Sequence, residues 1–365
     1  MTRQSLPPGS TIAILGGGQL GRMLAMAAAR LGMRTRVFSD RSGDPAFDVS
    51  DQCHCGSFGD SQAIARFVDG ADAVTYEFEN IPLDAIDAAI AFAPVRPDRR
   101  ALAVTQDRLA ERQFLERLSI PVSTYHQVAS LADLELAASR IDLPAILKTR
   151  RLGYDGKGQV RLERGGDTDL SEAWATIAET PAILERMIPF DRELSIVAVR
   201  SLSGETVFYD LSENKHGNQI LQCTQVPSTA SLRINELAQQ IARKIVTELD
   251  YVGTIAIEFF LLSDDNQGER LLVNEMAPRV HNSGHWTLNA AVTDQFENHI
   301  RAICDWPLGA TERFADAQMV NLIGEDIDAW PDHAKTPNAC MHLYGKRNVR
   351  AGRKMGHVTT IKPKT

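Results

Sequence analysis

EFFLLSDDNQGERLLVNEMAPRVHNSGHWT, residues 258–287, is the stretch on which the fold of this chain depends. Apolar runs at 255–262 and 271–273 predict two paired strands, and the polar segment between them predicts a turn. Each strand carries one acid, Glu258 or Glu275, and a hairpin brings the two carboxylates together. Burying two acids side by side costs free energy unless a cation lies between them. Because all-oxygen ligands favour a hard cation, the pair predicts a site for Mg²⁺ rather than Zn²⁺.

The loop after the second acid adds groups that suit an anion beside this metal. Asn274 supplies a neutral oxygen, and Arg279, His281 and His285 follow within a segment containing Gly and Asn. An arginine can hold a planar carboxylate or bicarbonate through two hydrogen bonds. The alternative is a plain hairpin with both acids on its solvent face, and the spacing alone leaves the two interpretations open.

Length and composition bound the possible functions. The chain has 365 residues, enough for two or three domains, and its 44% hydrophobic and 24% charged residues are typical of a soluble globular protein. No run approaches the roughly 20 apolar residues that a membrane span needs, and the start, MTRQSLPPGS, lacks an apolar signal region. We therefore expect a cytoplasmic protein with a short disordered N-terminal tail and no membrane partner. The net charge of −8 and the lack of a basic cluster with interleaved aromatics argue against a nucleic-acid partner.

The five cysteines fit a reducing compartment. Cys53 and Cys55 flank His54, which suggests zinc, but no second pair of ligands follows at the spacing of a zinc site. We therefore do not expect a zinc site here.

The N-terminal region has the pattern of a βαβ unit. A strand at 11–15 leads through GGGQLGRM (16–23) into a helix that ends near residue 31, and a second strand spans 34–38. The glycine spacing G-x-G-x-x-G, with an acid about twenty residues on, matches the dinucleotide fingerprint. Such glycines let backbone N–H groups approach a phosphate at a helix N-terminus. Whether that phosphate belongs to a nicotinamide nucleotide or to a sugar phosphate remains open.

A third strand, at 72–76, ends in the motif YEFENIP. Acids at the carboxyl end of a parallel strand lie where open α/β sheets bind ligands, so Glu77 and Glu79 suit ribose hydroxyls or an amine. Alternatively, these acids and Asn80 cap a predicted helix at 83–91.

A second glycine-rich segment, KTRRLGYDGKGQ, spans residues 148–159. Its three glycines predict a mobile flap between two strands, and Lys148 and Lys157 are cations placed to meet phosphates. The segment is not a P-loop, because no helix follows and the GK[ST] ending is missing. A hairpin that closes over a nucleotide is the functional interpretation, and a surface turn with incidental lysines is the alternative.

The rest of the chain supplies further candidate ligands. Glu185, in an apolar strand at 181–188, suits an adenine amine, and Glu193 suits ribose hydroxyls, although either acid is alternatively an ordinary surface residue. A polar turn at 214–218 precedes a strand at 219–226. The other predicted elements are helices at 98–118, 131–140, 231–249 and 292–303, strands at 145–149, 194–199, 319–323, 340–344 and 358–361, and a loop at 326–337.

A basic group lies near the C-terminus, where Lys346, Arg350, Arg353 and Lys354 occur close to two glycines. In an acidic chain such a local basic patch is a candidate phosphate site. A solvated basic tail is the alternative.

Six motifs, in this order, give the chain a family resemblance. They are GGGQLGRM (16–23), YEFENIP (76–82), QDR (106–108), GYDGKGQ (153–159), ENKHGNQI (213–220) and NEMAPRVHNSGHWT (274–287). Together they resemble the ATP-grasp superfamily and, within it, the N5-carboxyaminoimidazole ribonucleotide synthetases, over about residues 11–360. The resemblance implies an α/β fold, α+β overall, in three parts. These are a Rossmann-like pre-ATP-grasp domain at 1–107, a two-lobed ATP-grasp domain at 108–303 whose mobile lobe covers about 145–200, and a small β-rich C-terminal domain at 304–365.

The resemblance also implies the reaction. A C–N ligase of de novo purine biosynthesis would convert ATP, bicarbonate and 5-aminoimidazole ribonucleotide to ADP, phosphate and N5-carboxyaminoimidazole ribonucleotide, through carboxyphosphate. Mg²⁺ is the implied cofactor and a homodimer the implied assembly. Carboxyphosphate decays quickly in water, so its site must exclude water, which a glycine flap does.

The motifs shared with the family also imply which residues of this chain form the site. ATP would be held by Arg108, Lys148, Gly153, Tyr154, Asp155, Gly156, Lys157, Gly158, Gln159, Glu185, Arg186, Met187, Ile188, Glu193, His216, Asn274 and Glu275. The aminoimidazole ribonucleotide would lie against Gly18, Gln19, Leu20, Glu77, Asn80, Tyr154, Lys346, Arg353 and Lys354. The resemblance implies Glu258 and Glu275 as the Mg²⁺ ligands, and Arg279, His281 and Lys346 as the catalytic residues. Arg279 and His281 would handle bicarbonate and carboxyphosphate, with His281 either positioning that intermediate or taking the proton when the amine attacks carbon.

Other functions leave more of the sequence unexplained. Formate-dependent glycinamide ribonucleotide formyltransferase and biotin carboxylase share the flap and the acid pair. The bicarbonate loop with YEFENIP disfavours the first, and the absence of a visible biotin-carrier segment disfavours the second. A nicotinamide oxidoreductase explains only the N-terminal glycines. Glu258, Glu275 and Lys148 together argue against a non-catalytic nucleotide-binding regulator.

Overall fold

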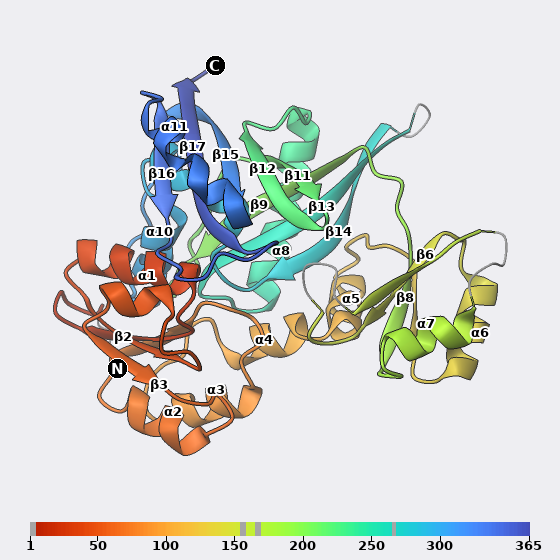
Figure 1. The fold of residues 1–365 in the computed structure, drawn as a ribbon, viewed down its shortest axis with the longest axis horizontal. Helices are drawn as coiled ribbons and strands as arrows, with labels where there is room; N and C mark the ends of the chain where they lie inside the picture. The colour runs from red at the N-terminus through yellow and green to blue at the C-terminus, as the bar shows by residue number, and fades with distance from the viewer. Residues whose placement is uncertain (1–4, 154–157, 165–168, 265–267) are drawn as a thin grey trace.

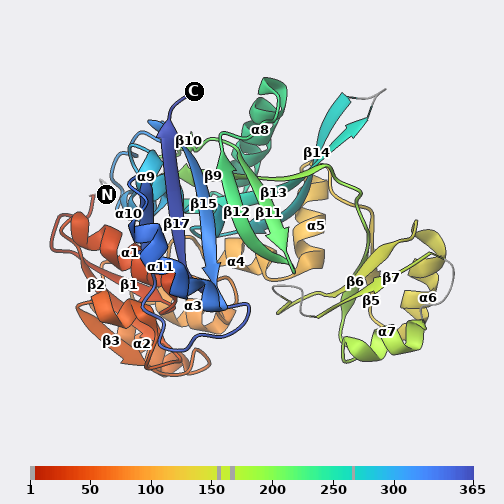
Figure 2. The same cartoon turned by 45° about the horizontal axis from the view of Figure 1, so that its top comes forward.

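The computed structural model describes residues 5–153, 158–164, 169–264 and 268–365. In these ranges the strands form three sheets, of four, nine and four strands (Figure 1). The first sheet lies in the N-terminal part and the nine-stranded sheet in the centre. The third sheet belongs to a lobe that stands apart from the rest in both views (Figures 1 and 2).

The N-terminal sheet has the order β3-β2-β1-β4, and all its pairings are parallel. The elements of this part are β1 (Thr11–Leu15), α1 (Gln19–Arg30), β2 (Arg34–Ser39), the 3₁₀ helix η1 (Pro45–Val49), β3 (Gln52–Cys55), α2 (Ser61–Val68), β4 (Ala73–Tyr76) and α3 (Leu83–Ile90). β1 is an almost wholly buried aliphatic run, as expected for a parallel strand with both faces covered. The predicted βαβ unit is confirmed, and β1 and β4 end at the same edge of the sheet, where Glu77 follows.

The nine-stranded sheet joins the acid hairpin to the C-terminal strands. Its order is β14-β13-β9-β11-β12-β15-β17-β16, with β10 paired to β9. Its strands are β9 (Arg192–Arg200), β10 (Thr206–Phe208), β11 (Ser212–Gly217), β12 (Ile220–Val226), β13 (Gly253–Asp264), β14 (Gly268–Ala277), β15 (Ala315–Ile323), β16 (Ala339–Leu343) and β17 (Lys354–Pro363). The predicted hairpin is confirmed, and its strands extend beyond their apolar runs. The C-terminal strands continue this sheet instead of forming a separate one.

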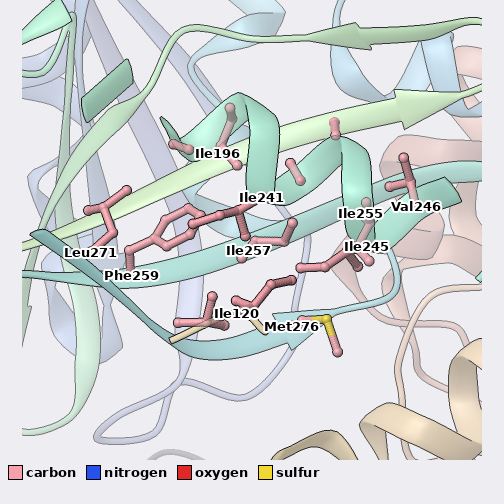
Figure 3. Close-up of a cluster of buried hydrophobic side chains, with 14 of the residues drawn as sticks. Ile120, Ile196, Ile241, Ile245, Val246, Ile255, Ile257, Phe259, Leu271 and Met276 are labelled. Carbon is pink, nitrogen blue, oxygen red and sulfur yellow. The ribbon is translucent and has the colours of Figure 1, made fainter. Parts of the chain in front are cut away.

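Helix α8 (Leu232–Glu248) covers one face of the hairpin. Its apolar side chains meet those of β9, β13 and β14 in a buried cluster, where Figure 3 shows Ile241 and Ile245 of the helix beside Ile257 and Phe259 of β13. Burying each such side chain stabilises the fold by about 1.5–3 kcal/mol. Since successive residues of a strand face opposite sides, this packing turns Glu258 to the other face.

The small lobe contains the third sheet, of order β5-β8-β6-β7, and two helices. Its elements are β5 (Tyr125–Val128), α6 (Leu131–Arg140), β6 (Ala145–Thr149), β7 (Gln159–Leu162), α7 (Leu170–Thr176) and β8 (Ala182–Arg186). β9 pairs with β13 in the central sheet and so lies outside this lobe's sheet. The segment predicted as a flap joins the paired strands β6 and β7. Tyr154, Asp155, Gly156 and Lys157 within it lie outside the described residues.

Two predicted elements are wrong because a polar residue within each is buried or caps a helix. Residues 98–118 form two helices, α4 (Arg99–Thr105) and α5 (Arg108–Arg117), because the Asp107 side chain accepts from two backbone N–H groups and starts α5 afresh. The predicted turn at 214–218 is mostly strand β11, in which Asn214 is buried and hydrogen-bonded. The polar composition of this segment therefore predicted a turn where the structure has a strand.

Two further expectations fail near the ends of the chain. The predicted loop at 326–337 contains most of the 3₁₀ helix η3 (Gly324–Ala329) and all of helix α11 (Trp330–Ala334). Residues 5–10, within the segment expected to be a disordered tail, pack against the region around residue 304. The Leu6 N–H donates to the Cys304 carbonyl, and Trp306 Nε1 donates to the Leu6 carbonyl.

Strand β3 carries the Cys-His-Cys sequence at the edge of the N-terminal sheet. Cys53 and Cys55 are exposed free thiols, whereas the His54 ring stacks on Phe38 with 5.3 Å between ring centroids. Because neighbouring strand residues face opposite sides, these three side chains do not converge on one point. No helix in the described ranges has the length and apolar content needed to cross a bilayer.

Candidate active site

A cleft of about 980 Å³ brings together the central sheet, the base of the flap and the N-terminal loops. Predicted site residues that line it are Gln19, Leu20, Glu77, Asn80, Arg108, Lys148, Gly153, Gln159, Met187, Glu193, His216, Glu258, Asn274, Glu275, Arg279, His281 and Lys354. Predicted site residues in the described ranges that do not line it are Gly18, Gly158, Glu185, Arg186, Ile188, Lys346 and Arg353. Most of the predicted site therefore converges on one place, although its members come from distant parts of the chain.

The acid pair lies on the cleft side of the hairpin. Glu258 and Glu275 are directly opposite one another in the β13–β14 ladder, just before a register shift. The Glu258 side chain is 14% exposed, and both acids line the cleft together with Lys148. Burial, and after it the charge of Glu275, raises the pKa of Glu258 to about 7. Glu275 is exposed, but it lines the cleft, and Glu258 is largely buried, so the two acids do not both lie on an outer solvent face of the hairpin. Two facing acids in a cleft favour a cation.

Glu185 is buried behind the cleft and shared by two cations. Its carboxylate oxygens lie 2.6 Å from Arg112 Nε and 2.6 Å from Lys148 Nζ. Burial raises the pKa of Glu185, but the charges of Arg112 and Lys148 outweigh burial and bring it to about 2. Glu185 is thus a firmly ionised anchor for Lys148, whose side chain reaches the cleft.

Arg112 and Glu111, to which no sequence motif points, also line the cleft. Each is 3% exposed. Arg112 Nη1 lies 3.0 Å from Glu111, and the backbone N–H of Met276 in β14 donates to Glu111 at 2.8 Å. Burial, although opposed by the charge of Arg112, raises the pKa of Glu111 to about 7. The available signal was spacing, because Arg108, Glu111 and Arg112 recur at intervals that place them on one face of α5.

The start of α5 is tied to the end of β6, where the flap begins. Arg108 donates to the carbonyls of Thr149 and Gly153, at 2.8 and 3.0 Å. Asp107, the cap of α5, accepts two hydrogen bonds from Arg150, at 3.0 and 2.6 Å. These contacts hold both ends of the KTRRLG segment against the helix.

His216 and Glu193 form a pair on neighbouring strands, with 2.6 Å between Nδ1 and the carboxylate. Burial lowers the pKa of His216, but the hydrogen bond to Glu193 and then the charge of Glu258 raise it overall. Both residues line the cleft near the acid pair. The two acids Glu193 and Glu258 therefore favour the protonated form of His216.

Arg279 links the hairpin loop to the N-terminal part. Its Nε is bound by Glu79, and its Nη1 donates to the Val280 carbonyl at 3.2 Å. Burial lowers the pKa of Arg279, but Glu79 outweighs burial and keeps the guanidinium charged. Burial also raises the pKa of Glu79, and Arg279 outweighs that effect as well.

The two histidines of the loop lie in different places. His281 lines the cleft with Nε2 3.4 Å from Glu258 Oε1. Burial, and then the charge of Arg279, holds the pKa of His281 well below its ordinary value. His285, which was expected beside the metal, is fully buried against Phe296 and His357 and does not line the cleft. The helical turn at 282–284 directs it into the interior.

The N-terminal glycine loop holds a carboxylate of its own chain. Glu77 accepts from the backbone N–H groups of Gly18 and Gly21, at 2.9 and 3.2 Å. A Cβ added at Gly18 would lie 2.7 Å from Glu77 Oε1. The Gly18 and Gly21 N–H groups, which in dinucleotide-binding folds would meet a pyrophosphate, are therefore bound to a carboxylate of the chain itself.

The basic group near the C-terminus is divided between two hollows. Lys354 lines the cleft, whereas Arg353 lines a second hollow of about 740 Å³ together with Arg41 and Arg350. Lys346 Nζ donates to the Lys354 carbonyl at 2.7 Å. Burial, and then the charge of Arg353, lowers the pKa of Lys346 to about 8.

Comparison with known families decides the assignment. Residues 10–106 match the ribonucleotide synthetase preATP-grasp domain, residues 113–296 the ATP-grasp domain, and residues 317–365 the phosphoribosylaminoimidazole carboxylase C-terminal domain. An N5-carboxyaminoimidazole ribonucleotide synthase of Brucella melitensis is 47% identical over 365 residues, which cover the whole of both chains. The chain belongs to the N5-carboxyaminoimidazole ribonucleotide synthase family.

Solved structures of this family agree. The ADP complex of an N5-carboxyaminoimidazole ribonucleotide synthetase has a TM-score of 0.93 and 39% identity, covering 99% of this chain and 94% of the other. The Aspergillus clavatus synthase in complex with ADP and 5-aminoimidazole ribonucleotide has a TM-score of 0.88 and 29% identity, covering 98% and 94%.

These matches confirm the predicted family, its combination of pre-ATP-grasp, ATP-grasp and C-terminal domain types, and the ATP-dependent ligase class. The predicted reaction, conversion of 5-aminoimidazole ribonucleotide to N5-carboxyaminoimidazole ribonucleotide in purine biosynthesis, is the reaction of this family and is confirmed with it. The oxidoreductase interpretation is excluded.

Proposed function

We propose that the single cleft performs both steps of the reaction. A bicarbonate oxygen attacks the γ-phosphorus of ATP, and ADP leaves. The amine nitrogen of the ribonucleotide then attacks the carboxyl carbon of carboxyphosphate, phosphate leaves, and the departing phosphate takes the proton that the amine loses. The observation that carries this proposal is that the acid pair, Lys148 and Arg279 line the same cleft.

The acid pair is proposed to hold Mg²⁺. The raised pKa of Glu258 supports this, because burial first, and then the charge of Glu275, disfavour the ionised acid in the absence of a cation. Asn274, beside Glu275, adds a neutral oxygen to the cleft lining. Among the described residues no cluster of three or more His, Cys, Asp or Glu side chains would hold a metal alone. Phosphate oxygens and water would complete the shell, as is usual for Mg²⁺, which would neutralise charge on the transferred phosphoryl group.

The remaining ATP contacts follow from the cleft and the flap. Lys148, anchored by Glu185, and Arg108 at the base of the flap would meet the phosphates, with His216 nearby. Residues 153–159 would close over them and exclude water. The backbone of residues 186–188 would hold adenine. Glu185, whose two oxygens are bound by Arg112 and Lys148, would act on the nucleotide through Lys148 rather than by touching adenine. Glu193 would accept from the ribose hydroxyls.

The ribonucleotide is proposed to lie at the N-terminal side of the cleft. Glu77, held by the glycine loop, would accept hydrogen bonds from this substrate, with Gln19, Leu20 and Asn80 beside it. The basic group Lys346, Arg353 and Lys354 would balance the 5′-phosphate. Tyr154 belongs to the predicted set and lies outside the described residues.

Arg279 and His281 are proposed to handle bicarbonate and carboxyphosphate. A guanidinium can clamp a planar carboxyl group with two parallel hydrogen bonds. Arg279 would exchange part of its contact with Glu79 for this ligand. Lys346, the third residue expected to be catalytic, does not line the cleft and donates to the Lys354 carbonyl, so it is proposed to act by positioning Lys354, which does line the cleft.

Substitution of Arg279 tests this arrangement. Arg279→Ala is expected to abolish bicarbonate-dependent ADP release and to leave the Kd for ATP within about twofold, since Arg279 meets bicarbonate and not the nucleotide. ADP release by a coupled assay and ATP binding by calorimetry measure the two effects. Loss of nucleotide binding would show that the assignment of Arg279 is misplaced.

Assembly, location and domain limits stay proposals from the sequence. A homodimer would give a mass of about twice 40.2 kDa in light scattering. A cytoplasmic location rests on composition and on free thiols, and fractionation tests it. The division at 107/108 and 303/304 predicts preferred cleavage near those positions in limited proteolysis.

A further inference from the structure

The ring of His281 is the cap of a short helix. His281 precedes the 3₁₀ helix η2 (Asn282–Gly284), and the backbone N–H of Ser283 donates to His281 Nδ1 at 3.3 Å. Ser283 Oγ lies 2.8 Å from the same nitrogen. A backbone amide can only donate, so Nδ1 carries a lone pair rather than a proton. The imidazole is therefore neutral, with its one proton on Nε2.

A buried line of polar side chains supports the same assignment. Thr224 Oγ1 donates to Asn214 Oδ1 at 2.9 Å, Asn214 Nδ2 donates to Ser195 Oγ at 2.8 Å, and Ser195 Oγ donates to Ser283 Oγ at 2.8 Å. The four side chains are each at most 5% exposed. Because a hydroxyl has one proton, this order leaves the proton of Ser283 for His281 Nδ1. Strands β9, β11 and β12 thus orient the ring from behind.

A separate group holds the backbone of His281. Gln295, fully buried at the start of helix α10 (Gln295–Ile303), accepts from the His281 N–H at 2.9 Å and donates to its carbonyl at 2.7 Å. Its amide packs on Gly284, where an added Cβ would lie 2.8 Å from the Gln295 side chain. Ring and backbone are therefore fixed by different contacts, and Nε2 has a defined direction.

The protonated nitrogen faces the acids. Nε2 lies 3.4 Å from Glu258 Oε1, in the cleft that also contains Arg279. Because Nδ1 accepts from the Ser283 backbone N–H, Nε2 is the nitrogen of the neutral ring that carries the proton, and it is the nitrogen that faces the cleft. The same proton is available to an oxygen of a carboxyl group bound beside Arg279.

We propose that Ser283 locks His281 in the Nε2–H form, so that His281 donates a hydrogen bond to the carboxyl group being transferred and does not accept the proton of the amine. This chooses between the two roles expected for His281. The presence of the carboxyl group rests on the proposed function, whereas the form of the ring does not. Ser283, Ser195 and Gln295 are positioning residues, because they act through His281.

The form of the ring is measured directly in the full-length enzyme without substrates. Long-range ¹H–¹⁵N correlation spectra of protein labelled with [¹⁵N]histidine distinguish a protonated from an unprotonated ring nitrogen, and His281→Gln identifies the signal. We expect Nδ1 of His281 to be unprotonated and Nε2 protonated. A proton on Nδ1, or on both nitrogens, overturns the proposal.

Kinetics test the consequence. A glutamine amide can replace the Nε2–H donor but cannot act as a base, so His281→Gln is expected to keep a kcat at least about tenfold above that of His281→Leu. Equal losses in the two variants would overturn the donor role. Ser283→Ala is expected to lower kcat about five- to tenfold with an unchanged KM for ATP.

Ser212→Ala is the matched control, since Ser212 is buried on the neighbouring strand opposite Ser195 and accepts from Trp286 Nε1. It should leave both the ring spectrum and kcat unchanged. If Ser212→Ala lowers kcat as much as Ser283→Ala, the effect is structural and the positioning role is wrong. If the wild-type enzyme fails to carboxylate the ribonucleotide, the proposed function is wrong. The protonation of the His281 ring would still be tested by its NMR spectrum.

Discussion

Glu258 on β13 and Glu275 on β14 lie directly opposite one another on the cleft side of the hairpin. The residues on either side of Glu258, Ile257 and Phe259, belong to the core beneath α8. Sliding either strand by one residue would expose that core, so the hydrophobic packing fixes the register. The same packing that stabilises the sheet therefore forces two acids together, and the repulsion between them favours a cation.

The first prediction concerns the metal. Glu275→Gln keeps the shape of the side chain but removes one of the two charges, so the Mg²⁺ concentration for half-maximal ADP release should rise about 10- to 100-fold. A titration of activity against Mg²⁺ at saturating ATP measures this. Glu269→Gln is the control, because Glu269 is on the same strand and pairs with Arg192 outside the cleft. An unchanged Mg²⁺ requirement in Glu275→Gln would remove the acid pair as the metal site.

The second prediction concerns pH and stability. The pKa of Glu258 is raised from 4.5 to about 7 in the folded protein, so folding favours the protonated acid. The contribution of Glu258 to stability is fully present below about pH 4.5 and is lost as the pH rises through about 7. Metal-free Glu258→Gln should therefore resist urea better than metal-free wild type at pH 8, by at most about 3 kcal/mol.

This advantage should shrink as the pH falls toward 4.5, which separates it from a general effect of the glutamine. Urea midpoints at several pH values, with a chelator present, give the comparison. A variant that is less stable than wild type at pH 8 would mean that the acid pair is already compensated in the free enzyme.

The third prediction concerns Arg112, which is buried between Glu111 and Glu185. Arg112→Met leaves Glu111 without its cation and Glu185 with Lys148 alone, and should lower the free energy of unfolding by about 3–5 kcal/mol. Arg100→Met removes a half-exposed partner of Glu248 and should cost no more than about 1 kcal/mol. Urea unfolding of both variants tests the difference. Equal, small losses would show that water reaches Glu185.

The fourth prediction concerns the glycine loop. Gly18→Ala places a methyl group 2.7 Å from Glu77 Oε1, which must then move. If Glu77 binds the ribonucleotide, its KM should rise about tenfold while the Kd for ATP stays unchanged. Gly59→Ala, where a Cβ meets only Ser57 Oγ at 3.5 Å, is the control. A raised Kd for ATP would place the nucleotide, and not the ribonucleotide, beside Glu77.

The sequence was most informative where a periodic apolar pattern coincided with a motif. The hairpin, helix α6 and strand β6 lie where apolar runs and caps predict them. The motifs also located Lys148 and His216, which the fold brings into one cleft. Polar residues misled the analysis, because Asn214 in β11 and Asp107 between α4 and α5 are satisfied by partners distant in the sequence or by a helix end.

Residues whose role depends on a partner distant in the sequence could not be predicted from the sequence. Arg112 is one of many arginines in the sequence, and only the packing of α5 against β8 and β14 makes it the counter-ion of Glu185. The glycine loop predicted an anion at the N-terminus of α1, and an anion is there. This anion is Glu77, because the parallel pairing of β1 and β4 brings Glu77 beside the glycine loop. No local sequence pattern predicts that pairing.

The sequence by itself determined the elements, the family and the chemical inventory, because periodicity, glycine spacing and motif order are local properties of the chain. The tertiary structure alone decided which charges meet. It paired Lys148 with Glu185, filled the glycine loop with Glu77 and turned His281 so that its Nε2 faces Glu258. The reason is physical: electrostatic and hydrogen-bond energies depend on distances of a few ångströms between residues far apart in sequence, and those distances exist only after the core has packed.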